Sequence, residues 1–142
     1  RTYFPVYQPQ SFLTSSYFGN LGYAYPTALG AKVAQPDKAV VALSGDGGFL
    51  FNSQELATAV QHGINAVVVV FNDNAYGNVL RDQVNRFDGR AIGAELHNPD
   101  FVKLAEGFGV EGRAVHSAHE LNDTLQYAFK TPGPVLIEAN LE

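Results

Sequence analysis

The sequence predicts an α/β fold, a three-layer doubly wound parallel sheet with helices on both faces. Two runs carry this prediction: residues 39–44 (AVVALS) and 65–72 (NAVVVVFN) are apolar throughout rather than alternating, which is typical of strands buried on both sides. Helical patterns separate these runs from each other and from a third apolar run near the end of the chain. Strands that alternate with helices favour a parallel sheet.

The first helix follows a segment rich in aromatic residues, Gly and Pro, and covers about residues 27–33. Pro26 suits its first turn, because a proline there has no N–H to leave without a partner. A second helix, at residues 53–63, separates the two strong strands. Asn52 or Ser53 is expected to cap it, and Gly63 to end it as a C′ glycine.

The second half of the chain repeats the alternation. Its expected elements are a helix at 76–84, a polar loop at 85–98, a helix from Asn98 or Asp100 to 108, a strand at 112–116, a helix at 118–130 and a strand at 133–141. Ser117 and Glu120 have the spacing of a capping box at the start of the last helix.

The composition is that of one globular domain over residues 1–142. The chain is 46% hydrophobic and 16% charged, and its 142 residues can bury a core. A formal net charge of −5 without a Lys/Arg cluster argues against a nucleic-acid partner. Because no apolar run reaches the length of a membrane span and no signal-peptide pattern is present, we expect a cytoplasmic protein without membrane contact.

The chain contains neither cysteine nor methionine. Without cysteine, disulfides and thiolate metal sites are excluded, and the redox compartment stays undecided. Because the sequence starts at Arg1 without an initiating Met, we expect it to be a piece of a longer multi-domain protein.

Both strong strands end in glycine, Asp or Asn, with almost no positive charge nearby. Ligands of parallel α/β sheets bind beyond the carboxyl ends of the strands. GDGG at residues 45–48 lies between a strand and a helix, so its amides can converge on an anion. Asp46 would repel a phosphate, whereas Mg²⁺ accepts both a carboxylate and phosphate oxygens. NDNAYG at residues 72–77 supplies further oxygen ligands, so the pattern predicts a metal–phosphate site.

Two common phosphate-binding motifs are absent. The third glycine of a dinucleotide fingerprint would fall on Leu50, and no Gly-Lys-Ser/Thr of a P-loop follows GDGG. A lone Asp-Gly pair is more often only a turn. Two oxygen-rich strand ends make that simple interpretation less favourable.

These motifs resemble those of thiamine-diphosphate-dependent enzymes, in which GDG and a following Asn-rich strand end bind the diphosphate. GNLGYAYPTALGA at residues 19–31 is similar to their segment that packs on the pyrimidine ring of the cofactor. ELATAV and PGPVLIEA extend the match over essentially the whole chain. The resemblance is closest to the carboxy-terminal cofactor domain of the acetolactate synthase, benzoylformate decarboxylase and pyruvate decarboxylase group.

The resemblance implies thiamine diphosphate and a Mg²⁺ ion held by Asp46, Asp73 and the backbone carbonyl of Ala75. The second ligand of the family is usually an Asn, so Asp73 is a departure that keeps an oxygen ligand and adds a negative charge. The implied cofactor-binding residues are Gly19, Leu21, Gly45, Asp46, Gly47, Gly48, Asp73, Ala75, Tyr76, Gly77 and Asn78. Among them, Gly19 and Leu21 would hold the aminopyrimidine, and Leu21 would also support the bent cofactor.

The resemblance further implies decarboxylation or carboligation of a small 2-oxo acid. The family takes its catalytic glutamate from a separate pyrimidine-binding domain, in cis or in a partner subunit, and no region here resembles that domain. No catalytic residue is therefore assigned in this chain, and we expect the isolated chain to be inactive. Residues 17–30, rich in aromatics and poor in charge, are expected to lie at the interface of a homo-oligomer.

Three alternatives stay open: a subunit of a split thiamine-diphosphate enzyme, a non-catalytic assembly module that keeps the fold, and an unrelated Mg²⁺-dependent nucleotide-binding domain. Asp46 and Asp73 weigh against a module that has no ligand. The absent P-loop lysine weighs against the nucleotide-binding domain. The residues specify neither the 2-oxo acid nor the choice between decarboxylase and carboligase.

Overall fold

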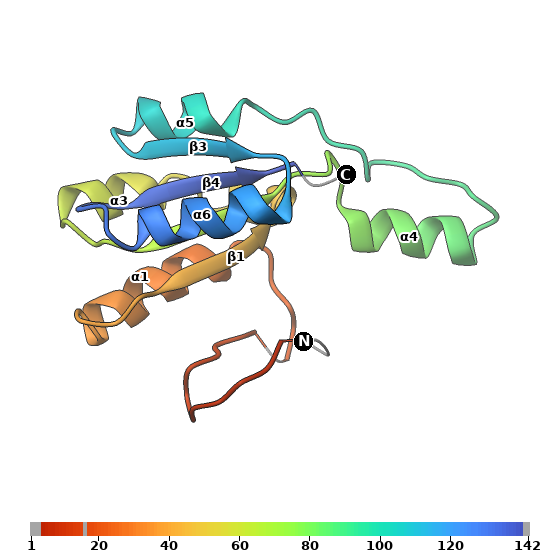
Figure 1. Cartoon of the computed structure of the whole chain (residues 1–142). Coiled ribbons are helices and arrows are strands. Elements are labelled where there is room, and N and C mark those ends of the chain that lie inside the picture. The colour runs from red at the N-terminus through yellow and green to blue at the C-terminus, as the bar shows by residue number, and fades with distance from the viewer. Residues whose placement is uncertain (1–3, 16, 141–142) are drawn as a thin grey trace.

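The computed structural model describes residues 4–15 and 17–140. Four parallel strands form one sheet in the order β1-β2-β4-β3 (Figure 1). The strands are β1 (Val41–Gly45), β2 (Val67–Phe71), β3 (Glu111–Val115) and β4 (Val135–Ala139). Residue 141 of the predicted last strand lies outside the described residues.

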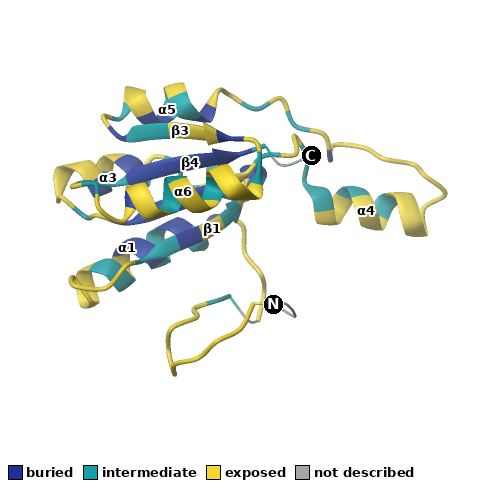
Figure 2. Ribbon diagram, viewed as in Figure 1, coloured by how far each residue is buried: buried dark blue, intermediate teal, exposed yellow. Residues whose placement is uncertain are grey.

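Helices cover both faces of the sheet, so the predicted three-layer α/β fold is confirmed. One face packs against α1 (Ala24–Ala34), α2 (Asp46–Leu50), α3 (Glu55–Gln61) and α5 (Phe101–Gly107). The other face packs against α6 (Ala118–Ala128). The side chains of β2 and β4 alternate between these two layers, and both strands are buried almost throughout (Figure 2).

The helix boundaries confirm several expected signals. Pro26 lies in the first turn of α1. Gly63 follows the C-cap of α3 with φ +60°, which is the left-handed conformation of a C′ glycine. The Ser117 Oγ accepts from the Glu120 N–H at 3.2 Å, while the Glu120 carboxylate accepts from the His116 N–H at 2.8 Å. The predicted Ser117 cap is therefore present, while Glu120 reaches back to the residue before the cap and not to the N–H of Ser117 itself.

The predicted start of the second helix is wrong. Residues after β1 enter α2 at once, and α3 begins only at Glu55, without a side-chain cap. Asn52 does not cap α3: its Nδ2 donates to the Gly22 carbonyl at 2.8 Å. Asn52 thereby ties the segment before α1 to the turn between α2 and α3.

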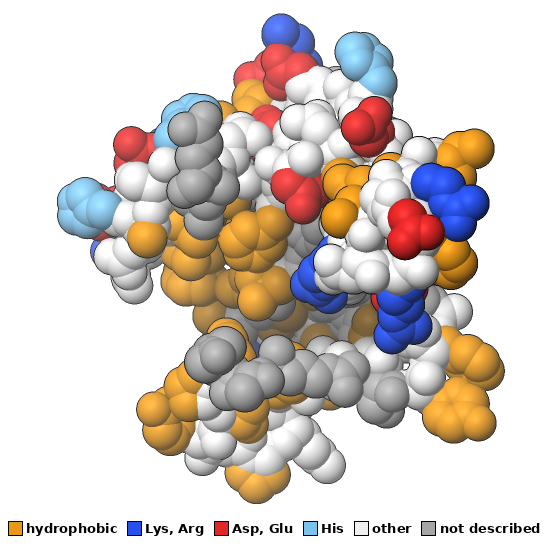
Figure 3. All heavy atoms as spheres, turned by 90° about the vertical axis from the view of Figure 1, so that its right-hand side faces the viewer, with side chains coloured by type: hydrophobic (Ala, Val, Ile, Leu, Met, Phe, Trp, Pro, Cys, Tyr) orange, Lys and Arg blue, Asp and Glu red, His pale blue; other side chains and the backbone are white. Residues whose placement is uncertain are grey.

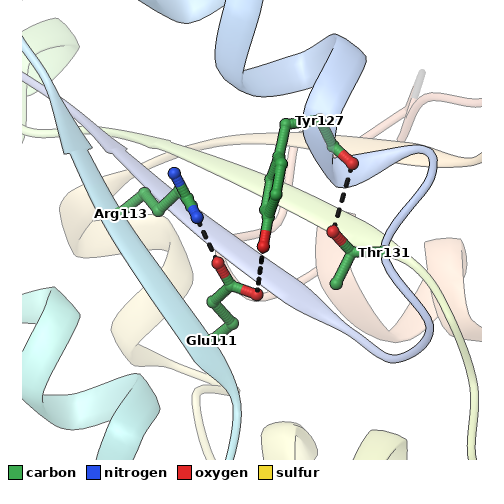
Figure 4. A network of polar contacts seen from close by, with 4 residues as sticks. All are labelled: Glu111, Arg113, Tyr127 and Thr131. Carbon is green, nitrogen blue, oxygen red and sulfur yellow. Dashed lines mark hydrogen bonds and ion pairs between the residues drawn. The ribbon is translucent and has the colours of Figure 1, made fainter.

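A polar network joins α6 to the edge strand β3 (Figure 4). Arg113 Nε donates to Glu111 Oε1 at 2.8 Å, and the Tyr127 hydroxyl donates to Glu111 Oε2 at 3.3 Å. The Arg113 guanidinium also lies 3.8 Å from the centroid of the Tyr127 ring, which is a cation–π geometry. The Glu111 carboxylate raises the pKa of Arg113.

Two parts of the chain lie away from the sheet. The helix α4 (Gly77–Arg86) extends past the carboxyl ends of the strands and contains no buried residue (Figures 1 and 2). The segment before α1 forms an extended loop on the same side (Figure 1). In the part of the chain that the structure describes, no helix is long and apolar enough to cross a membrane.

Candidate functional site at the carboxyl ends of the strands

The ends of β1 and β2 lie next to each other. Gly45 pairs with Phe71 in the parallel register, so Asp46 and Asn72 are the first residues beyond two adjacent strands. Figure 3 looks onto this side of the molecule, where hydrophobic side chains gather around a hollowed centre. The sheet therefore brings the two polar strand ends of the sequence together.

Asp46 is a buried carboxylate held by uncharged donors. Its side chain is 2% exposed. The Oδ1 atom accepts from the Gly47 N–H at 2.7 Å, and the Oδ2 atom accepts from Asn98 Nδ2 at 2.6 Å. Among the described residues, no Lys or Arg forms an ion pair with Asp46.

A hydrogen-bonded chain connects Asp46 to a second buried carboxylate. Asn98 Nδ2 also donates to Asn72 Oδ1 at 2.8 Å, and Asn72 Nδ2 donates to Glu138 Oε1 at 2.7 Å. Glu138, near the end of β4, is 8% exposed. Asp46 and Glu138 are the buried charged side chains among residues 4–15 and 17–140, and both lack a cationic partner there.

Burial of two carboxylates without a positive charge is energetically costly. Within the described residues, no group of three or more His, Cys, Asp or Glu side chains is arranged to hold a metal. The donor set nevertheless suits Mg²⁺, which needs only one or two carboxylates when phosphate oxygens complete its shell. A buried Asn98 Oδ1 with no partner in the described structure adds an unused oxygen at the same place.

Asp73 lies in the loop after β2 and is exposed. Its Oδ1 accepts from the Ala75 N–H at 3.2 Å. The hydrogen bonds between the two strand ends run through Asn72, the residue before Asp73, and not through Asp73 itself. Asp46 and Asp73 thus follow adjacent strands without a hydrogen-bonded link of their own.

The loop after β2 is covered by a segment close to Asn98. The Tyr76 N–H donates to the Ala94 carbonyl at 2.8 Å, and the Leu96 N–H donates to the Asn74 carbonyl at 2.7 Å. These bonds form a short antiparallel bridge, centred on Ala75, at the carboxyl end of the sheet. The second half of the loop predicted at 85–98 is consequently attached to the site.

Three of the predicted glycines sit where a side chain would collide or touch. A Cβ on Gly47 would overlap the Tyr76 ring, and a Cβ on Gly77 would lie 2.9 Å from Asp73 Oδ2. A Cβ on Gly48 would lie 3.7 Å from Leu21 Cδ2, so Leu21 approaches the GDGG turn. Side chains of this chain therefore occupy the space beside Gly47 and Gly48, and a larger residue at Gly47 would displace Tyr76.

The segment before α1 reaches the same turn through its backbone. The Gly22 N–H donates to the Gly48 carbonyl at 2.9 Å. Gly19, with φ +66°, donates its N–H to Ser15 Oγ at 3.2 Å and has no described contact with the strand ends. The structure thus places Leu21 beside GDGG and leaves Gly19 in its own turn.

Asn78 begins an open hollow along α4. The hollow has a volume of about 530 Å³ and is lined by Asn78, Val79, Arg81, Asp82, Gln83 and Phe87. Among these residues, Arg81 donates to Asn78 Oδ1 at 2.8 Å. The first two turns of α4 therefore offer both charged and apolar groups next to Asn78, a residue of the predicted site.

Comparison with known protein families identifies the family of this chain. The profile described as "Thiamine pyrophosphate enzyme, C-terminal TPP binding domain" matches residues 1–139. The chain belongs to this family. Thiamine pyrophosphate is another name for thiamine diphosphate, so the family predicted from the strand-end motifs is confirmed.

Curated relatives are longer proteins that are named as acetolactate synthases. A probable acetolactate synthase large subunit of Methanococcus aeolicus is 38% identical over 137 residues, and the acetolactate synthase of Bacillus subtilis is 39% identical over 140 residues. These matches cover 96% and 99% of this chain but only 23% and 24% of the relatives. The chain therefore spans about a quarter of their length.

A solved structure supports the same assignment. The thiamine diphosphate-dependent 4-hydroxybenzoylformate decarboxylase of Rhodococcus jostii RHA1 superposes with a TM-score of 0.79 at 35% identity, covering 86% of this chain and 24% of that chain. The thiamine pyrophosphate-binding fold is thus shared with enzymes named both as synthases and as a decarboxylase.

Sequence reasoning missed two residues of the site. The sequence indicates Asn98 only as a possible start of α5. The structure shows that Asp100 caps this helix, because its Oδ1 accepts from the Lys103 N–H at 3.0 Å. Glu138 is the second missed residue, and its signal is an acidic side chain inside the apolar run VLIEA, which indicates a polar partner.

Proposed function

We propose that this chain binds thiamine diphosphate together with Mg²⁺, as the C-terminal domain of an acetolactate synthase-like decarboxylase or carboligase of 2-oxo acids. The observation that carries the proposal is the pair of buried carboxylates, Asp46 and Glu138, linked through Asn98 and Asn72 without a cation. A divalent ion held at Asp46 together with a diphosphate would supply the missing positive charge.

In this proposal, Asp46, Asp73 and the carbonyl of Ala75 hold the ion. The diphosphate is bound by backbone amides that follow the two strands, at Gly47, Gly48, Gly77 and Asn78. Gly45 leaves the end of β1 free of a side chain, and Leu21 and Tyr76 cover the turn with apolar surface. Gly19 and Leu21 contact the pyrimidine end of the cofactor.

The bound cofactor would supply the electron sink for decarboxylation of a 2-oxo acid. The residues of this chain position the cofactor and its ion, and Leu21 and Tyr76 limit the access of water. No residue of this chain is proposed to transfer a proton to the substrate. A pyrimidine-binding domain, in cis or in a partner subunit, completes the site, so the chain by itself is inactive.

Calorimetric titration of the complete protein with thiamine diphosphate, with and without Mg²⁺, tests this proposal. We expect binding that requires Mg²⁺ and is abolished by Asp46→Ala. Asp37→Ala removes an exposed carboxylate before β1, at the opposite end of the strand, and is expected to leave binding unchanged. Binding that ignores the metal, or a preference for ATP, would contradict the proposal.

A further inference from the structure

We propose that Asn98 is a positioning residue that sets the orientation of the Asp46 carboxylate, and with it the affinity of the site for Mg²⁺. This inference rests on the proposed function. It assigns a role to a residue that is 52 positions away from Asp46 in the chain, in the loop before α5. The role is carried out by the two N–H bonds of a single side-chain amide.

The contacts of Asn98 require an amide at this position. Its Nδ2 group donates one hydrogen to Asp46 Oδ2 and the other to Asn72 Oδ1, at 2.6 and 2.8 Å. Both acceptors lack hydrogens of their own at these atoms, so the opposite orientation of the amide would place oxygen against oxygen. The orientation of Asn98 is therefore determined by its neighbours.

The far end of the chain of bonds fixes Asn72 in the same way. Glu138 is a carboxylate and can only accept, so it binds the Nδ2 of Asn72 at 2.7 Å and leaves the Asn72 Oδ1 to face Asn98. Donation thus runs outward from Asn98 on both sides, through Asn72 to Glu138 and directly to Asp46. Each end of the chain is a carboxylate that only accepts, and Asn98 is the donor at its centre.

The backbone on both sides of Asn98 is held in place. Two residues before it, the Leu96 N–H is bonded to the Asn74 carbonyl, and two residues after it, Asp100 caps α5. Asn98 therefore does not depend on the ion for its position. An acid that is held before the ion arrives loses less conformational freedom when it binds.

The same geometry explains why the Asn98 oxygen is unused. Both hydrogens of the amide are committed to Asp46 and Asn72, and the Oδ1 is buried without a partner in the described structure. An unpaired buried oxygen is unfavourable unless a positive charge or a donor arrives. A hydrated Mg²⁺ at Asp46 would bring both, so metal binding would relieve this defect.

The test measures the Mg²⁺ concentration that gives half-maximal binding of thiamine diphosphate to the complete protein. Asn98→Ala is expected to raise this concentration about 10–100-fold, the usual effect of removing a residue that orients a metal ligand. Asn65→Ala, at the exposed residue before β2 at the opposite end of the strand, is the matched control and is expected to change nothing. The melting temperature without ligand is recorded in parallel.

A residue that only supports the fold would lower the melting temperature and leave the Mg²⁺ requirement as it is. A folded Asn98→Ala protein whose requirement stays within about twofold of the wild type therefore overturns the inference. If Asn98→Ala does not fold, Asn98→Leu keeps the side-chain volume without the donors and is judged by the same criterion. Wild-type protein that binds no thiamine diphosphate with Mg²⁺ would instead overturn the proposed function.

If both Asn98 variants unfold, Glu138→Gln supplies the deciding measurement. The glutamine amide can turn its own donor toward Asn72, which would turn Asn72 Nδ2 toward Asn98 and remove the acceptor that Asn98 now has there. We expect a raised Mg²⁺ requirement here as well, and an unchanged requirement in this folded variant overturns the inference.

Discussion

Tyr25 is a buried residue whose hydroxyl group has no hydrogen-bond partner in the described part of the chain. Its ring packs against Phe49 in an edge-to-face contact, with 5.8 Å between the centroids. The ring therefore stabilises the core, whereas the hydroxyl has lost its water without replacement.

We expect Tyr25→Phe to raise the free energy of unfolding by about 1 kcal/mol, because it removes only the unpaired hydroxyl. Urea denaturation measures this change. Tyr127→Phe is the matched control: the Tyr127 hydroxyl donates to Glu111, so its removal is expected to lower stability by about 1 kcal/mol. A loss of stability in Tyr25→Phe would show that a partner for this hydroxyl exists in solution.

Tyr25 is also expected to make the stability of the protein depend on pH in the alkaline range. Burial, and secondly the charge of Glu55, raise the pKa of Tyr25 far above its ordinary value. Because the folded state favours the neutral phenol, ionisation of Tyr25 does not affect the free energy of unfolding below about pH 10. As the pH rises from there towards the raised pKa, the free energy of unfolding falls. Tyr25→Phe should therefore lose less stability than the wild type above about pH 10 in the same urea experiment.

At the scale of single residues, the sequence predicts the polar residues that follow the strands, but not the side chains with which they form hydrogen bonds. Asp46 was recognised because an acid inside a glycine turn after a buried strand is unusual. Asn98 is 52 residues further along, and its contact with Asp46 depends on how the loop after α4 returns across the sheet. No local sequence pattern predicts the path of this loop, so the contact between Asn98 and Asp46 could not be predicted.

The caps of the helices show which element boundaries are readable in a sequence. Ser117 caps α6 as predicted, whereas Ser53 resembles a cap in sequence but lies in a turn before α3. The two serines thus form a natural pair for comparison: one caps a helix and the other does not.

Ser117→Ala is expected to lower the free energy of unfolding by about 1 kcal/mol, since the Glu120 N–H loses its acceptor at the start of α6. Ser53→Ala is expected to have little effect. Chemical denaturation of both variants gives the comparison. Equal losses in the two variants would mean that the Ser117 cap makes no special contribution.

The element that the sequence did not reveal is α2. Its five residues, DGGFL, include two glycines, which disfavour helix in isolation. The helix forms because Phe49 is buried between Tyr25 and Phe101, with ring centroids 5.8 and 6.0 Å away. Tertiary packing outweighs local propensity here, whereas β2 was predictable because its apolar run matches its burial on both faces.

On the scale of the whole molecule, apolar surface is concentrated outside the sheet. Large exposed hydrophobic side chains occur along the segment before α1, along α4 and in the loop after it, including Tyr7, Tyr17, Phe18, Val79 and Ile92. Such surface favours an interface with another domain or another copy of the chain. This exposed apolar surface is consistent with the finding that the chain spans about a quarter of the length of its relatives.

Tyr17 and Phe18 offer the most direct test of the proposed oligomer. They are 88% and 80% exposed, and their rings contact each other edge-to-face, with 4.7 Å between the centroids. Exposed paired aromatics are typical anchors of protein interfaces. Replacing them removes apolar area without opening the core, since neither belongs to the buried clusters.

We expect the double change Tyr17→Ser and Phe18→Ser to weaken self-association of the complete protein by about tenfold or more, as loss of interface anchors does. Sedimentation velocity over a concentration series measures the effect. Val33→Ser, an exposed apolar position on α1, is the control and should leave the association unchanged. Because the free energy of unfolding of the protomer should not change, a double variant that associates like the wild type would exclude this segment from the interface.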